Sequence, residues 1–380
     1  MRKEAVRHLR GVGARRGSVL DLCVFDSDGD QVSEGVLWTE DRSDWYPVVA
    51  GVPNFLNGSL QSDLAEFAVR HNLPRKIGEP QRTGACEQAR TTASFTDKWR
   101  RFRRYGLEPE HRQFLFGWYC QKLGVADEDE LRAFYRDRSR VLEVGPGSGF
   151  NTRFIAESCQ GEVYALDISE AALTTYENTR ALRNCTVVRA DLMEAPFDDQ
   201  SFDLIVADGV LHHTPNTYEA VRALYRKLRP GGQFFFYIYK KMGPLRQFVD
   251  GYIREHFTRL APDDCYVACE AITELGRELS RLGVQITLTK PIRILGIPAG
   301  THDVQRLIYY NILKCFWNES FDFATNNMVN FDWYHPHHAW QHSPAEVEQW
   351  LGELGITESR FNDTNPNGIS VVLRKPVDGA

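Results

Sequence analysis

The 380-residue sequence has no Cys-x-x-Cys pair, and its eight cysteines are scattered along the chain. Zinc sites commonly take thiolates from such pairs, so we expect no metal and interpret the cysteines as reduced, mostly buried thiols of a cytoplasmic protein. Long apolar runs are also lacking. The longest, Phe234–Tyr239, is far shorter than the roughly 20 residues that cross a bilayer. The basic N-terminus has no apolar stretch behind it, so we expect neither a signal peptide nor contact with a membrane.

An excess of positive charge is lacking too. The chain has 45 Lys and Arg against 51 Asp and Glu, a formal net charge of -6. Proteins that bind nucleic acid usually present a basic face, so we expect no nucleic-acid partner. The basic stretch Lys98–Arg104 leaves a local patch open, although a solvated helix face is the simpler interpretation.

From Arg140 onward, short apolar strands alternate with amphipathic helices. Strands are predicted at 140–144, 162–166, 185–189, 202–207 and 233–239, and helices at 151–159, 170–182 and 216–228. The capping box Ser343-Pro-Ala-Glu346 then starts a helix over 345–354, and two late strands are expected at 358–361 and 369–373. The alternation predicts an α/β fold whose mostly parallel sheet is covered by helices on both faces.

The remaining segments depart from this alternation. Residues 1–60 predict a small β-rich unit, and 61–138 a linker with a helical cap, helical over 95–138. Residues 241–342 predict a helical insertion after the fifth strand, with helices at 272–282 and 304–317. The core is then 139–240 together with 343–376. We expect the insertion to form a lid over the substrate and to be the surface of any homodimer; the oligomeric state itself is left open.

A glycine-rich loop lies where the first of these strands passes into a helix. Its sequence, Glu143-Val-Gly-Pro-Gly-Ser-Gly149, has the spacing G-x-G-x-G at Gly145, Gly147 and Gly149. Glycines at such a turn let backbone amides approach a ligand closely. Phe150 stands where a dinucleotide fold has its third glycine. Glu143 is placed to accept a hydrogen bond from an ammonium group.

Acidic residues follow the next two strands. Asp167 ends the second strand, 18 residues after Gly149, where a carboxylate can hold both hydroxyls of a ribose. Asp191 follows the third strand and can accept from an adenine amino group while Leu192 packs on the ring. A nicotinamide-binding fold stays open as an alternative, but the missing third glycine disfavours it.

The motifs VLEVGPGSG, ALDIS, ADLMEAPF, SFDLIVADGVLHHT and LRPGG occur in this order. The sequence thereby resembles the class I S-adenosylmethionine-dependent methyltransferases of the small-molecule type, closely over 140–240 and loosely over 343–375. The resemblance implies a seven-stranded Rossmann-like sheet whose last strand is antiparallel. It also implies S-adenosylmethionine as the cofactor, with contacts from Gly145 and Gly147 to its methionine moiety, from Asp167 to its ribose and from Asp191 to its adenine. The other predicted cofactor contacts are Glu143, Gly149, Ile168, Leu192 and Asp208.

Part of the N-terminal unit also has a family resemblance. Residues 35–40 and 45–55 resemble the small zinc-ribbon proteins that partner methyltransferases, whose pattern has YPI-x-x-GIP near its end. Those proteins often use two Cys-x-x-Cys knuckles. Here Cys23 is alone at the first knuckle, and 37–40 has no cysteine at the second. Tetrahedral zinc needs four good ligands, so we interpret this unit as a degenerate, metal-free ribbon that packs against the catalytic domain.

Two histidines are candidates for the catalytic base. The loop after the fourth strand, Asp208-Gly-Val-Leu-His-His-Thr214, faces the transferred methyl group in the family that the chain resembles. His212 and His213 have an ordinary pKa near 6.5, which suits a base. A structural role, in which the two side chains hold the loop by hydrogen bonds, stays equally open. The loop lacks the Asn/Asp-Pro-Pro-Tyr run that is frequent in methyltransferases of nucleic-acid amines and glutamine amides.

Four of the eleven histidines lie close together in the segment 333–342. We predict substrate-binding residues at Trp333, His335, His337, His338 and His342. A metal site and plain packing or surface positions stay open. Pro344 argues against a helix over 335–342, which would be needed to place His338 and His342 on one helix face.

These features together predict a methyltransferase that acts on a small biosynthetic molecule with an apolar or aromatic portion. A methyltransferase of protein or RNA is the first alternative, favoured by the ribbon-like N-terminus and by the basic residues 98–104. A cofactor-binding protein with a chemistry other than methyl transfer is the second.

Overall fold

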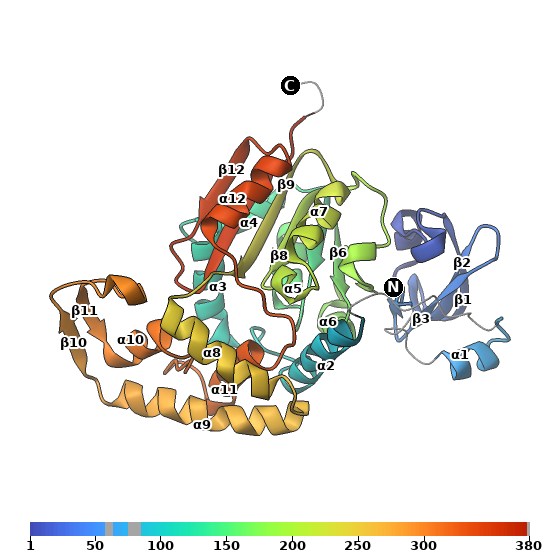
Figure 1. The fold of residues 1–380 in the computed structure, drawn as a ribbon. Helices are drawn as coiled ribbons and strands as arrows, with labels where there is room; N and C mark the ends of the chain where they lie inside the picture. The colour runs from blue at the N-terminus through green and yellow to red at the C-terminus, as the bar shows by residue number, and fades with distance from the viewer. Residues whose placement is uncertain (58–63, 75–84, 378–380) are drawn as a thin grey trace.

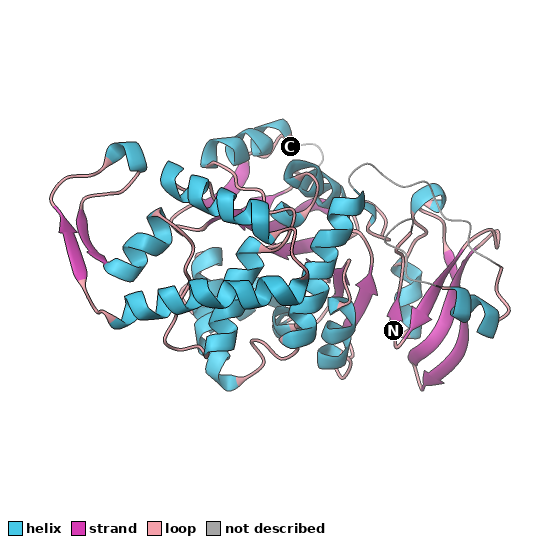
Figure 2. Cartoon of the chain, turned by 60° about the horizontal axis from the view of Figure 1, so that its bottom comes forward, coloured by secondary structure: helices cyan, strands magenta, loops and turns pink. Residues whose placement is uncertain are grey.

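The computed structural model describes residues 1–57, 64–74 and 85–377 (Figure 1). The predicted boundary at residue 60 and part of the predicted linker, residues 61–63 and 75–84, lie outside these residues. The chain is built around a central sheet, with a small β-rich unit beside one edge and a layer of helices across one end (Figures 1 and 2).

The central sheet has seven strands in the order β12-β13-β9-β8-β5-β6-β7. The strands are β5 (Arg140–Val144), β6 (Glu162–Asp167), β7 (Cys185–Arg189), β8 (Phe202–Asp208), β9 (Leu228–Tyr239), β12 (Glu358–Asn362) and β13 (Gly368–Arg374). β5 to β9 pair in parallel, whereas β13 is antiparallel to both β9 and β12. The predicted α/β fold with an antiparallel last strand is therefore confirmed. β9 begins five residues before its predicted start, because a register shift beside β8 takes up the turn at 229–232.

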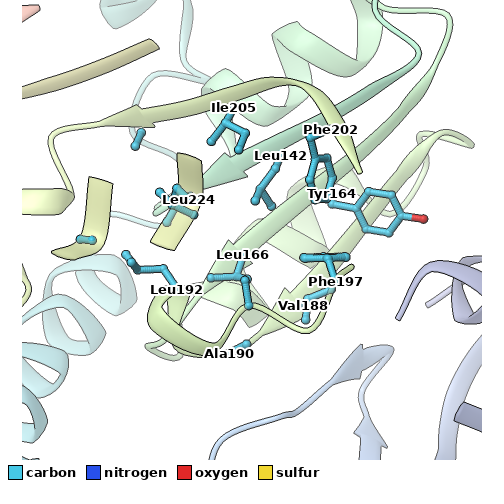
Figure 3. Close-up of a cluster of buried hydrophobic side chains, with 14 of the residues drawn as sticks. Leu142, Tyr164, Leu166, Val188, Ala190, Leu192, Phe197, Phe202, Ile205 and Leu224 are labelled. Atoms are coloured by element: carbon cyan, nitrogen blue, oxygen red, sulfur yellow. The ribbon is translucent and has the colours of Figure 1, made fainter. Parts of the chain in front are cut away.

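Helices cover both faces of the sheet, which explains why its strands are apolar on both sides. One face packs on α7 (Thr217–Lys227) and α12 (Pro344–Glu353). The other packs on α3 (Pro109–Leu123), α4 (Glu128–Arg136) and α5 (Phe150–Ser158). α6 (Ala171–Thr179) lies beside β6 and β7. On the first face, Leu142, Leu166 and Ile205 point toward Leu224 of α7 (Figure 3). The predicted capping box at Ser343 is present and starts α12.

The N-terminal unit is a four-stranded antiparallel sheet in the order β1-β2-β3-β4. It contains η1 (Lys3–His8), η2 (Gly13–Arg15), β1 (Leu20–Asp28), β2 (Gln31–Thr39), β3 (Trp45–Val49) and β4 (Val52–Pro53). Its likeness to a zinc ribbon stays a prediction. Within the described residues, no group of three or more His, Cys, Asp or Glu side chains is placed to hold a metal ion.

This unit is joined to the central sheet beside β7. The backbone amide of Phe55 donates to the carbonyl oxygen of Arg189 at 2.8 Å, and Asn54 forms a parallel bridge to the same residue. Tyr46 and Phe55 belong to the same buried cluster as Leu142 and Leu166. The unit therefore supports the strand that leads to Asp191.

Among the described residues, four helices precede the sheet and seven elements lie in the insertion. The former include α1 (Ala65–Arg70), α2 (Ala85–Arg101) and α3 with α4, so the predicted helical region 95–138 is broken into separate helices. The insertion contains α8 (Pro244–Phe257), α9 (Pro262–Arg281), the hairpin β10 (Gln285–Leu288) and β11 (Gly300–Asp303), η6 (Arg293–Leu295), α10 (Val304–Asn311) and α11 (Phe323–Tyr334). α9 starts ten residues before its predicted position. No helix in the described ranges combines the length and apolar character needed to cross a membrane.

Phe55→Ala tests whether the N-terminal unit is part of the core. Phe55 is 2% exposed, so its truncation should cost about 3–5 kcal/mol of the free energy of unfolding and lower one cooperative transition of the whole chain. Urea unfolding followed by circular dichroism measures this change. Phe25→Ala is the matched control and should cost much less, because Phe25 is 37% exposed. If Phe55→Ala removed a separate early transition and left the main transition unmoved, the N-terminal unit would not share a core with the central sheet.

Candidate active site

A cavity of about 710 Å³ lies at the carboxyl ends of β5, β6, β7 and β8. Its volume is within the usual range for ligand pockets. The ends of these strands form one wall, α2 and α3 a second, and α10, α11 and the segment between them a third. The cavity is thus lined on these sides by segments that flank the sheet in sequence, and Figure 2 shows the layer of helices that these segments form.

The glycine-rich loop is tightly enclosed. Gly145 has φ +68, and a Cβ atom there would lie 2.3 Å from the Val210 side chain. Gly147 has φ +60, and its Cβ would lie 2.4 Å from the indole of Trp99. A residue with a side chain fits neither the backbone nor the space at these two positions. Gly145 lines the cavity, whereas Gly147 lies behind Trp99 and Gly149 forms the N-cap of α5.

Three carboxylates line the same part of the cavity. Glu143 accepts hydrogen bonds from Asn151 Nδ2, at 2.8 Å, and from Thr152 Oγ1, and burial raises its pKa to about 7. Asp167 Oδ1 accepts from the backbone amide and hydroxyl of Ser169 at 2.8 and 2.7 Å, and burial raises its pKa as well. Asp191 Oδ1 accepts from the Met193 amide at 2.9 Å.

The apolar partners predicted for the cofactor, Ile168 and Leu192, also line the cavity. They come from the loops that follow β6 and β7, directly beyond Asp167 and Asp191. The structure therefore brings together seven of the nine predicted cofactor residues, with Gly147 and Gly149 shaping the loop from behind.

Asp208, the remaining acid, is held by a lysine that the sequence analysis did not select. Lys122 Nζ of α3 lies 2.7 and 2.9 Å from the two carboxylate oxygens of Asp208. The side chains are only 5% and 10% exposed. The ammonium also lies 4.0 Å from the ring centre of Trp118 and 4.2 Å from that of Tyr237. The pair gives this wall of the cavity no net charge.

The two candidate bases differ in their surroundings. His213 lines the cavity, and its Nδ1 lies 2.7 Å from the carbonyl oxygen of His338. A carbonyl oxygen only accepts, so Nδ1 carries the proton and Nε2 keeps the lone pair of the neutral ring. Burial lowers the pKa of His213 to about 4.

His212 faces away from the cavity. It is fully buried, does not line the cavity, and its ring stacks on Tyr239 with centroids 3.7 Å apart. Neither ring nitrogen has a hydrogen-bond partner among the described residues. The geometry therefore gives His212 a packing position, and only His213 is placed to act on a ligand.

The predicted substrate-binding residues of the segment 333–342 also differ in whether they line the cavity. Trp333 lines the cavity, but His335, His337, His338 and His342 are not among its lining residues in the described chain. His335 stacks on Phe331 and its Nε2 lies 3.2 Å from the carbonyl oxygen of Leu260. His342 Nε2 lies 2.9 Å from Thr217 Oγ1. The substrate-binding role of these four histidines stays a prediction, and the structure places them outside the lining of the cavity, after the end of α11 at Tyr334.

Comparison with known proteins agrees with this geometry. Residues 142–236, about a quarter of the chain, match the family described as "Methyltransferase domain". They contain the glycine-rich loop, Asp167, Asp191 and His213, so the family match falls on the part of the cavity that the sheet provides.

Two curated relatives match over a similar stretch. A cycloartenol-C-24-methyltransferase of Arabidopsis thaliana is 34% identical over 102 residues, which are 26% of this chain and 30% of that protein. A demethylmenaquinone methyltransferase of Staphylococcus epidermidis is 35% identical over 97 residues, or 25% and 40% of the two chains. The chain thus spans well under half the length of these relatives.

Among solved structures, a putative S-adenosyl-L-methionine-dependent methyltransferase of Methanococcus maripaludis is 13% identical, with a TM-score of 0.39 over 80% of this chain and 99% of that one. The assignment of the fold rests on the strand order of the present chain.

Several other cavity residues lie outside residues 142–236, in segments that carry no recognised motif. Lys98 Nζ of α2 lies 2.9 Å from Asp332 Oδ1 of α11. Arg306 and Lys314 reach the cavity from α10 and the segment that follows it. These residues are far apart in sequence, and no spacing rule connects them. For Arg306 and Lys314, the signal that could have selected them is a single charge within an apolar stretch, whereas Lys98 lies in the basic stretch 98–104.

Lys122→Met tests the buried ion pair. It leaves the Asp208 carboxylate buried without its partner, which should cost about 3–5 kcal/mol of the free energy of unfolding. The double variant Lys122→Met with Asp208→Asn removes both charges and should recover most of this loss. Urea unfolding of both variants measures the difference. Arg222→Met, which removes an exposed partner of Glu219, is the control and should cost no more than about 1 kcal/mol. Equal losses in the single and double variants would contradict the pairing.

Proposed function

We propose that the chain is an S-adenosylmethionine-dependent methyltransferase that acts on a small molecule. One observation carries the proposal: Gly145, Glu143, Asp167 and Asp191 line one end of a cavity that continues past His213 into the helical insertion. Such a cavity has one end suited to the cofactor and a second end for an acceptor.

The residues at the first end fit the chemistry of this cofactor. S-adenosylmethionine brings a reactive sulfonium methyl group, an ammonium group, ribose hydroxyls and an adenine. Glu143 is the carboxylate nearest the glycine-rich loop and would accept from the ammonium group, which favours its ionised form. Asp167 would hold the ribose hydroxyls, with one carboxylate oxygen already oriented by Ser169. Asp191, Leu192 and Ile168 would enclose the adenine, while Gly145 gives the methionine moiety access to the backbone.

The second end supports a small acceptor. Its walls are mostly aromatic, including Phe95, Trp118, Tyr239 and Trp333. The two curated relatives are named for small-molecule acceptors. Against an RNA or protein acceptor, the basic stretch 98–104 is largely neutralised within the chain. Lys98 pairs with Asp332, Arg100 with Glu170, Arg101 with Asp97 and Asp263, and Arg103 with Glu177.

We assign the base to His213. In the neutral ring, Nε2 takes a proton from the acceptor as methyl transfer proceeds, and the hydrogen bond to the His338 carbonyl keeps the tautomer and ring plane fixed. Phe95 and Tyr239 pack against the ring at centroid distances of 4.8 and 5.5 Å. They hold the imidazole in place and help exclude water.

Binding of S-adenosylhomocysteine, followed by calorimetry, tests the cofactor site. Asp167→Ala removes the carboxylate assigned to the ribose hydroxyls, and hydrogen bonds to a charged group contribute about 1.5–3 kcal/mol. The affinity should therefore fall by about tenfold or more. Asp198→Asn, an exposed aspartate that pairs with Arg10, should leave the affinity unchanged. Equal affinities of wild type and Asp167→Ala would refute the ribose assignment.

His213→Gln tests the base. Once an acceptor is found by following S-adenosylhomocysteine release with a panel of phenols, carboxylic acids and amines, the variant should lower kcat by about 10²–10⁴. Its affinity for S-adenosylhomocysteine should not change. Because the pKa of His213 is lowered to about 4, the neutral form persists above pH 5, and the wild-type rate should show no inflection near pH 6.5.

His212→Gln serves as the comparison for that measurement. It alters a packed ring outside the cavity, so it should affect stability more than kcat. If His212→Gln and His213→Gln lower kcat equally, His213 is not the base.

A further inference from the structure

Lys314 enters the cavity because α10 ends early. The sequence predicts a helix to residue 317, but α10 ends at Asn311, and Ile312 has φ -120 and ψ -61. The backbone of Lys314 is then held on both sides. Its amide donates to Asp250 Oδ1 at 3.0 Å, and its carbonyl oxygen accepts from the Tyr334 hydroxyl at 3.0 Å. This segment directs the lysine into the cavity.

The ammonium group of Lys314 has aromatic neighbours but no acidic partner. The residue is 6% exposed and lines the cavity. Nζ lies 4.4 Å from the ring centre of Trp333 and 5.9 Å from that of Tyr309. No described residue accepts a hydrogen bond from Nζ or forms an ion pair with it. A buried, unpaired ammonium is costly, and burial correspondingly lowers the pKa of Lys314 to about 7.

The acids that could neutralise Lys314 are already engaged. Asp332 accepts from Lys98 at 2.9 Å. Asp250 forms an ion pair with Arg246 and accepts from Trp333 Nε1 and the Tyr334 hydroxyl at 2.8 and 2.9 Å. Neither carboxylate is therefore free to neutralise the charge of Lys314.

A second cation of the insertion lines the cavity near the same tyrosine ring. Arg306 of α10 lines the cavity, and its guanidinium lies 5.6 Å from the ring centre of Tyr309, the same ring that Lys314 approaches. Arg306 donates to the carbonyl oxygen of Trp317 at 3.2 Å, and it has no acidic partner in the described parts of the chain. The insertion end of the cavity thus carries Lys98, Arg306 and Lys314 against one acid, Asp332.

The two ends of the cavity are opposite in charge. Glu143, Asp167 and Asp191 line the end assigned to the cofactor, and the Lys122–Asp208 pair between the ends is neutral. Acids suit a cationic cofactor, and unpaired cations in a cleft are the usual mark of an anion-binding site. We propose that Lys314 and Arg306 bind a carboxylate or phosphate group of the methyl acceptor. This inference rests on the proposed function, since it names the class of acceptor for the same cavity.

Ring contacts indicate what separates this anion from the reacting atom. His213 contacts Tyr239 at 5.5 Å, Tyr239 contacts Trp333 at 4.6 Å, and Trp333 contacts Lys314 Nζ at 4.4 Å. An acceptor that reaches from the base to the anion site passes along Tyr239 and Trp333. An aromatic or similarly sized apolar portion fits that path, with the methylated atom near His213 and the anion at Lys314.

Three small probes test this assignment on protein saturated with S-adenosylhomocysteine. Benzoate carries a carboxylate, phenyl phosphate a phosphate, and benzamide has nearly the shape of benzoate without the charge. Calorimetry should show that one or both anions bind at least about tenfold more tightly than benzamide, as charge-assisted hydrogen bonds predict. The preferred anion then decides between carboxylate and phosphate. Binding of benzamide as tight as that of both anions, or no binding of either anion, overturns the proposal.

Substitutions of Lys314 and Arg306 test whether the anion binds at these two side chains. Lys314→Met should weaken the preferred anion by about tenfold or more and leave benzamide unchanged, and Arg306→Gln should act in the same direction. Lys290→Met, an exposed lysine of the same insertion that does not line the cavity, should change nothing. Unchanged anion affinity in Lys314→Met overturns the proposal.

Failure of the anion-site proposal can be distinguished from failure of the proposed cofactor site. If S-adenosylhomocysteine does not bind, the proposed function fails, and the anion titrations are run on the free protein, where the same comparison of wild type and Lys314→Met decides the anion site. Lys314→Met should itself fold, because removing an unpaired buried charge does not leave another behind.

Discussion

Parallel pairing of β5, β6, β7 and β8 is the constraint on which the cavity depends. Parallel strands end at one edge, so residues from 145 to 213, distant in sequence, meet in one place. Backbone hydrogen bonds fix the loop ends directly. The amide of Gly145 donates to the carbonyl oxygen of Leu166 at 2.8 Å, and that of Ala190 to Asp167 at 3.0 Å. The acids therefore hold their positions because the sheet register holds them, and the register is held by a core that covers both faces.

The same constraint explains which features the sequence predicts well. Strand positions follow from apolar runs between turns, and β5 and β7 have the predicted ends. The ends of these strands position the loops that follow them. No comparable sequence pattern predicts the helices of the insertion. α11 was not predicted because it buries asparagines, such as Asn326 and Asn330, which hydrogen-bond to neighbouring backbone or to Thr273 and interrupt the apolar stripe. In the predicted helical region 95–138, Trp118 of α3 both packs against the core and lines the cavity, a distinction that periodicity alone does not make.

The charged side chains inside the cavity are subject to a second constraint. A buried ion is costly unless an ion of opposite charge lies beside it. Most cations there satisfy this constraint through segments that meet only in the fold, as Lys122 of α3 does with Asp208 of β8. This explains why the lysines were missed: each partner is set by tertiary contact, and Lys98 in particular looked like part of a solvated basic face. It also makes Lys314 informative, because a single unpaired ammonium stands out where the other lysines are neutralised.

The insertion can shape the proposed acceptor end of the cavity without disturbing the proposed cofactor end. Its ends are tied together at the tip of β9, where the His342 amide donates to the Tyr239 carbonyl at 2.9 Å and the Lys241 amide to the His342 carbonyl at 2.9 Å. The chain thus leaves and rejoins the sheet at one point, and the backbone of His342, more than its ring, closes the loop. Changes between these two residues alter the wall that holds Arg306 and Lys314, while the strand edges that hold Asp167 and Asp191 keep their register. This arrangement lets the proposed acceptor end vary while the proposed cofactor end stays unchanged.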